Sequence, residues 1–373
     1  MTDIDPLRSS RPAVPPDDAS PPPPAKSSPA PLRTAAEIPT WPEAGGGHLA
    51  RFVRAATSSG AAPHPVLAMG VEAPAPATTD RDTRAQRGLD AFRALATPTY
   101  HVPGEGDVPV PAPFRMPHTA QVPPPMRGDE VSARYASTEA RVLAHQLELR
   151  ALAAKLGVHD LYAVSIGHAS PETVRRLTQG LIDAGRVPPP DGRTSTATRV
   201  RAMMCDYGLG FDCAGYVQRA FLAAHSVTRA QAGFAPGGAV ESLGDLPAKG
   251  FTKVAPQDAR PGDIVVLDAP PCDGPGHRLV VYDRRDLSTT EVASLSRHAT
   301  GPALTPGRVS ELHVDSSFGS GGLPDRGGVS RQAWYYDAGS KQWGHDVGGT
   351  VVFSPLPYYG DSLRGIYHFP EKP

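Results

Sequence analysis

The sequence predicts an α+β domain in the C-terminal half of the chain, in which a helix is followed by an antiparallel sheet. A helical pattern of apolar residues begins near Cys213. Several short β-rich runs follow it, and glycine and proline separate these runs. A helix followed by consecutive strands, without regular alternation of the two, favours an antiparallel sheet packed against the helix.

The N-terminal third of the chain has a different composition. Of the 43 prolines in the 373 residues, 25 lie before residue 126. Proline-rich runs lack backbone donors and have too few apolar side chains to build a core. We therefore expect residues 1–128 to be a disordered, proline-rich region. Inside it, residues 83–97 have helical spacing, which fits either a transient helix or a docking element.

Two helices are predicted after the proline-rich region. Apolar residues recur among charged ones over 129–157, a pattern typical of a long amphipathic helix that ends at Gly157. A second helix should begin after Ser170, a suitable N-cap followed by proline, and end at Gly185. We interpret residues 129–186 as a small helical unit that either caps the next domain or binds a partner.

The last predicted domain spans residues 195–373, after a loop at 187–199. Its helix should begin at Cys213, with Asp212 as the N-cap. The expected strands are 262–269, 277–285, 310–319, 331–339, 348–355 and 364–370.

Charge and hydropathy exclude several classes of protein. The 37 basic and 38 acidic residues give a formal net charge of -1, so neither nucleic acid nor an anionic membrane is the expected main partner. No apolar run approaches the roughly 20 residues of a membrane span, and the first residues lack the apolar segment of a secretory signal. We expect a chain that is made in the cytoplasm and does not cross a membrane.

The three cysteines, Cys205, Cys213 and Cys272, do not indicate a disulfide scaffold, because their number is low and odd. Whether Cys205 and Cys272 pair stays open. Together with His277 the cysteines would make four zinc ligands, but the close Cys-x-x-Cys spacing of structural zinc sites is missing. We expect no metal and no cofactor.

Cys213 is the candidate nucleophile. In the first turn of a helix, unpaired backbone N–H groups and the helix dipole stabilise a thiolate. Such positions lower a cysteine pKa from about 8.5 towards about 3.5–7.5. The alternative is a buried thiol with a structural role only.

His277 is the candidate base, because it begins a predicted strand at the edge of a loop. The next strand places Glu311, His313 and Asp315 on one face by two-residue alternation. Of these, Asp315 and His313 are the candidates for the group that orients the imidazole. The alternative is that they are polar residues on a solvated face of the sheet.

Three motifs in this order, FDCAGYVQRAF, ARPGDIVVL and GPGHRLVVYD, resemble the NlpC/P60 cysteine peptidases of the papain-like clan, which are related to the CHAP amidases. The resemblance covers roughly residues 195–370. It implies a papain-like fold with a nucleophile helix packed on an antiparallel sheet. It also implies Cys213 as nucleophile, His277 as base and Asp315 or His313 as the third member of the triad.

The chain departs from the family pattern at two points. Ala214 stands where the family usually has serine, and 38 residues separate His277 from Asp315 (315 − 277), more than in the family's short hairpin. We expect the insertion within 286–307 to form a loop or flap.

The resemblance implies a thiol-dependent hydrolase of peptide or amide bonds, with bacterial cell-wall peptides (peptidoglycan) as the leading substrate class. A wall hydrolase without a secretory signal suggests an effector toxin that a specialised secretion or injection apparatus delivers. The apparatus or a chaperone would then bind the N-terminal region. The alternatives are a cysteine acyltransferase or deamidase acting on proteins, and a catalytically inactive binding module of the same fold.

Overall fold

The computed structural model describes residues 79–115, 130–234, 246–268, 276–318, 327–347, 350–357 and 361–370, with side chains from residue 140 in the second range. All of these belong to the unit formed by residues 49–373. The expected disorder of residues 1–78 and 116–128 lies outside the described residues, as does Cys272.

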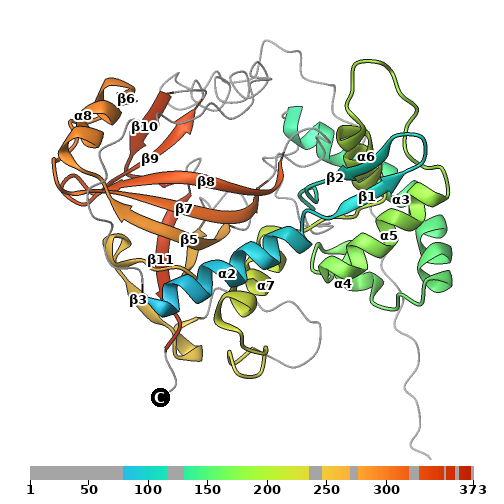
Figure 1. The fold of residues 1–373 in the computed structure, drawn as a ribbon, viewed down its shortest axis with the longest axis horizontal. Helices are drawn as coiled ribbons and strands as arrows, with labels where there is room; N and C mark the ends of the chain where they lie inside the picture. Colours follow the sequence, from blue (N-terminus) through green and yellow to red (C-terminus); the bar gives the residue numbers. More distant parts are fainter. Residues whose placement is uncertain are drawn as a thin grey trace, which may run out of the picture. The chain divides into compact units, whose positions relative to one another are not determined.

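The described C-terminal part of the chain forms a nine-stranded sheet with the order β3-β11-β4-β5-β7-β8-β9-β10-β6 (Figure 1). Neighbouring strands are antiparallel, except for β10 and β6, which are parallel. The strands are β3 Thr252–Val254, β4 Ile264–Asp268, β5 Arg278–Asp286, β6 Ala299–Thr300, β7 Val309–Phe318, β8 Gly328–Asp337, β9 Gln342–Val347, β10 Thr350–Ser354 and β11 Ser362–His368. The prediction of an α+β chain with an antiparallel sheet is confirmed, although β3, β6 and β9 were not expected.

The two faces of the sheet contact different apolar clusters, because side chains alternate along each strand. On β5, Val280 belongs to the cluster that includes the buried residues of α7 (Cys213–His225). Leu279 and Val281 belong to a second cluster, which contains Phe318 and both Trp334 and Trp343. We call the first the helix face and the second the far face.

The helices confirm the predicted periodicity and its end signals. The long helix is α3 Glu130–Lys155, followed by Gly157 with φ +64°. The side chain of Ser170 accepts from the backbone of Thr173 at the start of the next predicted helix. The described helices are α2 Asp80–Leu95, α3, α4 Leu161–Ser165, α5 Pro171–Asp183, α6 Thr196–Asp206, α7 and α8 Thr289–Arg297, with short 3-10 turns at Pro247–Lys249 and Pro256–Asp258.

The expectation of disorder is wrong for residues 79–115, which form α2 and the hairpin of β1 Thr99–Val102 and β2 Gly106–Pro109. Helix α2 lies beside α7 (Figure 1). Its Phe92 ring packs at 5.1 Å from the ring of Tyr216. The prolines on either side of residues 79–115 dominate the composition of the N-terminal region. A short apolar stripe within α2 is nevertheless enough to bury one face of this helix.

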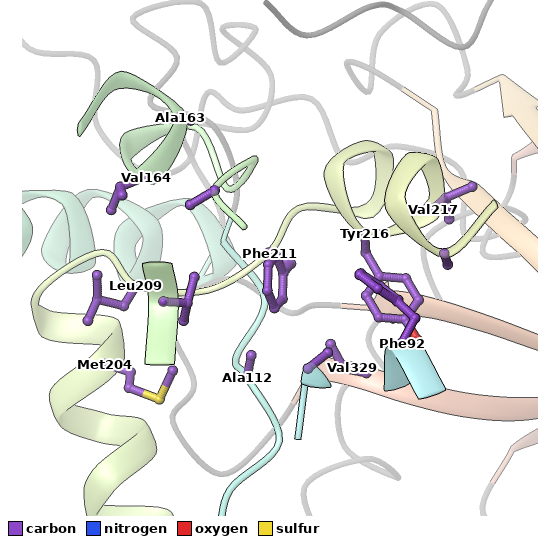
Figure 2. Packing of buried hydrophobic residues seen from close by; sticks show 14 of the residues in the cluster. Phe92, Ala112, Ala163, Val164, Met204, Leu209, Phe211, Tyr216, Val217 and Val329 are labelled. Atoms are coloured by element: carbon purple, nitrogen blue, oxygen red, sulfur yellow. The ribbon is translucent and has the colours of Figure 1, made fainter. Parts of the chain in front are cut away.

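The predicted helical unit and the predicted C-terminal domain share one core. Buried residues of α3, α5 and α6 belong to the same cluster as those of α7 and of the helix face of the sheet. Figure 2 shows this continuity, with Met204 and Leu209 on one side, Tyr216 and Val329 on the other, and Phe211 between them. A boundary between 186 and 195 therefore does not describe how this part of the chain packs.

The insertion after β5 is not a loop throughout. A capping box of Ser288 and Glu291 begins α8, and Val292 of this helix packs in a small cluster with Leu287 and Val309. Strand β6 then pairs with β10 at the edge of the sheet. The expectation of a loop or flap is therefore wrong for these residues. The sequence carries the S-x-x-E pattern that is typical of a helix start, and this pattern accounts for α8.

Candidate functional site

Cys213 is the first residue of α7, as predicted. The side chain of Asp212 caps this helix by accepting from the backbone N–H of Gly215. Helix α7 packs against β5 and β7. Phe211, just before the cap, is fixed by two donors to its carbonyl, the Arg115 N–H at 2.8 Å and the Ser317 hydroxyl at 2.8 Å. The start of α7 is therefore held from several elements at once.

The sulfur of Cys213 lies at the junction of α7 with β5. The backbone N–H groups of Arg278 and Ala214 act to lower the pKa of the thiol and so favour the thiolate. Cys213 is partly exposed. Burial, and next the negative charge of Asp212, raise the pKa of this thiol to about 12. The shift is opposite to the one expected from the helix position alone.

His277 precedes β5 directly, but its ring lies on the far face of the sheet. The ring packs 4.9 Å from the ring of Phe318, a member of the far-face cluster. Its carbonyl accepts from the N–H of Leu267, another member of that cluster. Burial, and next the charge of Arg278, lower the pKa of His277 to about 3. At neutral pH the imidazole is therefore uncharged.

Arg278 takes the position on the helix face that the predicted triad gives to the histidine. Its guanidinium donates to the carbonyls of Leu267 at 2.6 Å and His277 at 2.9 Å. Burial lowers its pKa, while its attraction to Cys213 acts in the opposite direction. The charged side chain nearest the thiol on β5 is thus a guanidinium.

Asp315 is fully buried on the helix face and is engaged by Arg331. The guanidinium Nε and Nη2 of Arg331 lie 2.7 and 2.9 Å from its two carboxylate oxygens. The same Nη2 also donates to Asp90 of α2 at 3.1 Å, and the Tyr282 hydroxyl donates to Asp90 at 3.0 Å. In this structure Arg331 links Asp315 of the sheet to Asp90 of α2.

His313 lies further along β7, away from Cys213. Its Nε2 is 3.4 Å from one carboxylate oxygen of Glu311. The other oxygen of Glu311 lies 2.6 Å from Nη2 of Arg285. Four residues separate His313 from Ser317, which corresponds to roughly 13 Å along a strand. The structure therefore brings Cys213 to the start of β5, but it orients His277 away and engages Asp315 and His313 elsewhere.

One buried pair next to Cys213 was not predicted. His168, in the turn between α4 and α5, lies 2.8 Å through Nε2 from Oδ2 of Asp212. The two side chains are only 6 and 9 % exposed. A histidine in the turn between two predicted helices was visible in the sequence, but no spacing rule linked it to Asp212.

Cys205 is a buried thiol in α6, and burial raises its pKa to about 11. Over the described ranges, no group of three or more histidine, cysteine or acidic side chains is arranged to hold a metal ion.

Comparison with known proteins finds no matching family model, no similar curated protein and no similar solved structure. Within the part of the chain that the structure describes, no helix has both the length and the apolar character of a membrane span.

Proposed function

We propose that the chain is a cysteine hydrolase that cleaves peptide or amide bonds in bacterial cell-wall peptides, with Cys213 as the nucleophile. The observation that carries this proposal is the placement of the thiol at the first turn of α7, where the backbone N–H groups of Ala214 and Arg278 favour the thiolate. Donors fixed in this way stabilise negative charge that develops on the sulfur during attack. The resemblance of the three motifs supports the substrate class.

In the proposed reaction the thiol loses its proton as the sulfur attacks the amide carbonyl. An imidazole with a pKa of about 3 is uncharged at neutral pH, and its unprotonated ring nitrogen can accept this proton. The protonated imidazole then returns it to the leaving amine, and water hydrolyses the thioester. For His277 to act as this base, the backbone at 276–278 must turn the ring from Phe318 towards Cys213 when substrate binds.

A second candidate is a binding module that has the fold but no catalysis. The pKa values of about 12 for Cys213 and about 3 for His277 favour it, as does the orientation of His277 on the far face. Both groups are then neutral, and an imidazole of such low pKa is a weak base. Cys213 would be a buried thiol that stabilises the contact between α7 and β5.

The two candidates are separated by incubating the full chain with purified bacterial cell-wall peptides and reading the products by mass spectrometry. The hydrolase predicts cleaved peptides with wild type and none with Cys213→Ala or His277→Ala. Cys205→Ala is the matched control, because it removes a buried thiol that lies outside the site. Folded wild-type protein without products, or products that persist in Cys213→Ala, would reject Cys213 as a hydrolytic nucleophile.

Delivery to the cell wall is tested by directing the full chain either to the periplasm or to the cytosol of a bacterial host. The proposal predicts lysis only from the periplasm, and only with Cys213 present. The full chain is needed because residues of α2, α3 and α5 belong to the same core as α7. Equal growth with both locations would contradict an action on the wall.

A further inference from the structure

The turn between α4 and α5 contacts the start of α7 at three places. The carbonyl of Gly167 accepts from the N–H of Asp212 at 3.1 Å. The Nε2 of His168 lies 2.8 Å from Oδ2 of Asp212. The carbonyl of His168 accepts from Nη2 of Arg219, further along α7, at 2.8 Å. This turn therefore connects the N-terminal helices to the helix that begins with Cys213.

The carboxylate of Asp212 is divided between the helix and the turn. One oxygen accepts from the Gly215 N–H and the other pairs with His168. Gly215 allows this close approach, since a Cβ there would lie 2.6 Å from the Gly167 oxygen and 3.0 Å from Cγ of His168. Burial raises the pKa of Asp212, while His168 acts against the shift. Without the histidine, a buried carboxylate would lose its main partner.

Helix geometry separates the roles of the neighbouring residues. Successive residues of an α-helix are about 100° apart, so Asp212 and Gly215 face the turn while Cys213 points towards the sheet. This agrees with the effect of Arg278, at the start of β5, on the pKa of Cys213. His168 therefore acts on Asp212 and reaches the thiol only through it.

We propose that His168 is a positioning residue that holds the Asp212 carboxylate at the start of α7 by a hydrogen bond, disperses its negative charge, and thereby sets the orientation and the ionisation of the Cys213 thiol. The role in catalysis rests on the proposed function, but the effect on the thiol can be measured without turnover.

Few charged groups surround this pair in the described chain. The positive charge of Arg278, on β5, acts to lower the pKa of both Asp212 and Cys213. Arg115 donates through Nε to the carbonyl of Ser165 beside the turn, at 3.2 Å, and Arg219 binds the carbonyl of His168. The negative charge of Asp212 disfavours the thiolate, and His168 is the residue that pairs with this charge.

The test is the alkylation of Cys213 by iodoacetamide in the native full chain, at one pH near 8.5, followed by peptide mass mapping. Below its pKa, the reactivity of a thiol is proportional to its thiolate fraction, which changes about tenfold per pKa unit. His168→Ala should slow the alkylation by about threefold to tenfold. Asp212→Asn, which keeps a capping side chain but removes the charge, should accelerate it by about tenfold.

The double variant decides whether His168 acts through Asp212. In an Asp212→Asn background, His168→Ala should change the rate by less than about twofold, because no carboxylate charge remains for His168 to disperse. The same slowing as in wild type would overturn the proposal, and so would faster alkylation in the single variant His168→Ala. His168→Gln, which retains an N–H donor, should recover part of the rate and serves where the alanine variant does not fold.

His368→Ala is the matched control for loss of stability. Half-buried His368 pairs with buried Asp263, with Nδ1 and Oδ1 2.7 Å apart, next to β4 and at a distance from the start of α7. This variant should lose stability but leave the alkylation of Cys213 unchanged. If the alkylation of Cys213 were slowed equally in His168→Ala and His368→Ala, general destabilisation would explain the slowing, and the proposal would be rejected.

The digest of cell-wall peptides separates this inference from the proposed function. Alkylation rates that respond as expected, without any cleaved peptide from wild type, would retain the positioning role and reject the hydrolase. Cleavage by wild type, with unchanged alkylation and cleavage in His168→Ala, would reject the positioning role alone.

Discussion

The two faces of β5 and β7 differ in chemistry, although their residues adjoin in sequence. The helix face carries Arg278, Asp315 and Ser317, and each of these has a polar partner. The far face carries His277 against Phe318, within an apolar cluster. A shift of one residue along a strand exchanges the two faces. A motif that places a histidine at the start of a strand therefore does not determine whether the histidine meets the cysteine.

The largest expected effect tests whether Asp315 is a structural group on the helix face. Arg331→Met removes the partner of a fully buried carboxylate and should lower the free energy of unfolding by about 3–5 kcal/mol. Urea unfolding of the full chain measures this change.

Arg175→Ala is the control for Arg331→Met, because its pair with Glu172 is exposed on one helix and should contribute less than about 0.5 kcal/mol. If Arg331→Met were as stable as wild type, Asp315 would not depend on this pair and would be available to orient a catalytic histidine.

The next effect tests the assignment of His277 to the apolar face. Its pKa is about 3 in the folded chain and 6.5 for an unperturbed histidine. Between these values the unfolded chain binds a proton that the native chain does not, so stability falls as the pH decreases from 6.5 towards 3. The loss between pH 6.5 and 5 should be about 2 kcal/mol, and His277→Leu should remove it.

Chemical unfolding of wild type and His277→Leu at several pH values gives the two slopes. His225→Leu tests the same pH effect at a second buried histidine, because burial lowers the pKa of His225 to about 4 at the other end of α7. Parallel slopes for wild type and His277→Leu would show that His277 takes up protons in the native state and does not lie in an apolar environment.

The sequence was sufficient to predict the elements that depend on local rules. The N-caps at Asp212 and Ser170 and the glycine after α3 follow from backbone geometry. Six strands could be located by their β-rich runs between turn residues. These features need no knowledge of the rest of the fold.

The features that were missed depend on contacts between distant segments. The burial of α2 depends on α7, whose backbone passes so close to Gly88 that any side chain there would clash with Ala223. The pair of His168 and Asp212 depends on the packing of the α4–α5 turn. Which face of the sheet the His277 ring occupies depends on where β5 begins and on the irregular pairing of β5 with β7 between Val281 and Asp283. None of these follows from spacing along one segment.

The third effect concerns the thiol on the helix face. With a pKa of about 12, Cys213 should be alkylated slowly at pH 7, and the rate should rise about tenfold per pH unit up to pH 9. Iodoacetamide labelling with peptide mapping measures the profile, and Cys205, with a pKa of about 11, is the internal reference. A rate that is already constant near pH 7 would contradict a protonated thiol and would indicate a charged partner at the sulfur.

The smallest effect compares two neighbouring serines of β7. The hydroxyl of Ser317 donates to the carbonyl of Phe211 at 2.8 Å, whereas that of Ser316 donates to the carbonyl of Arg278 at 2.6 Å. Each Ser→Ala change removes one buried hydrogen bond and should lower the free energy of unfolding by about 1 kcal/mol. Ser317 fixes the residue that precedes Asp212, whereas Ser316 fixes the carbonyl of Arg278, so the alkylation rate of Cys213 should change more in Ser317→Ala than in Ser316→Ala. Equal rates in the two variants would mean that the start of α7 keeps its position without Ser317, through bonds such as those to Arg115, Gly167 and His168.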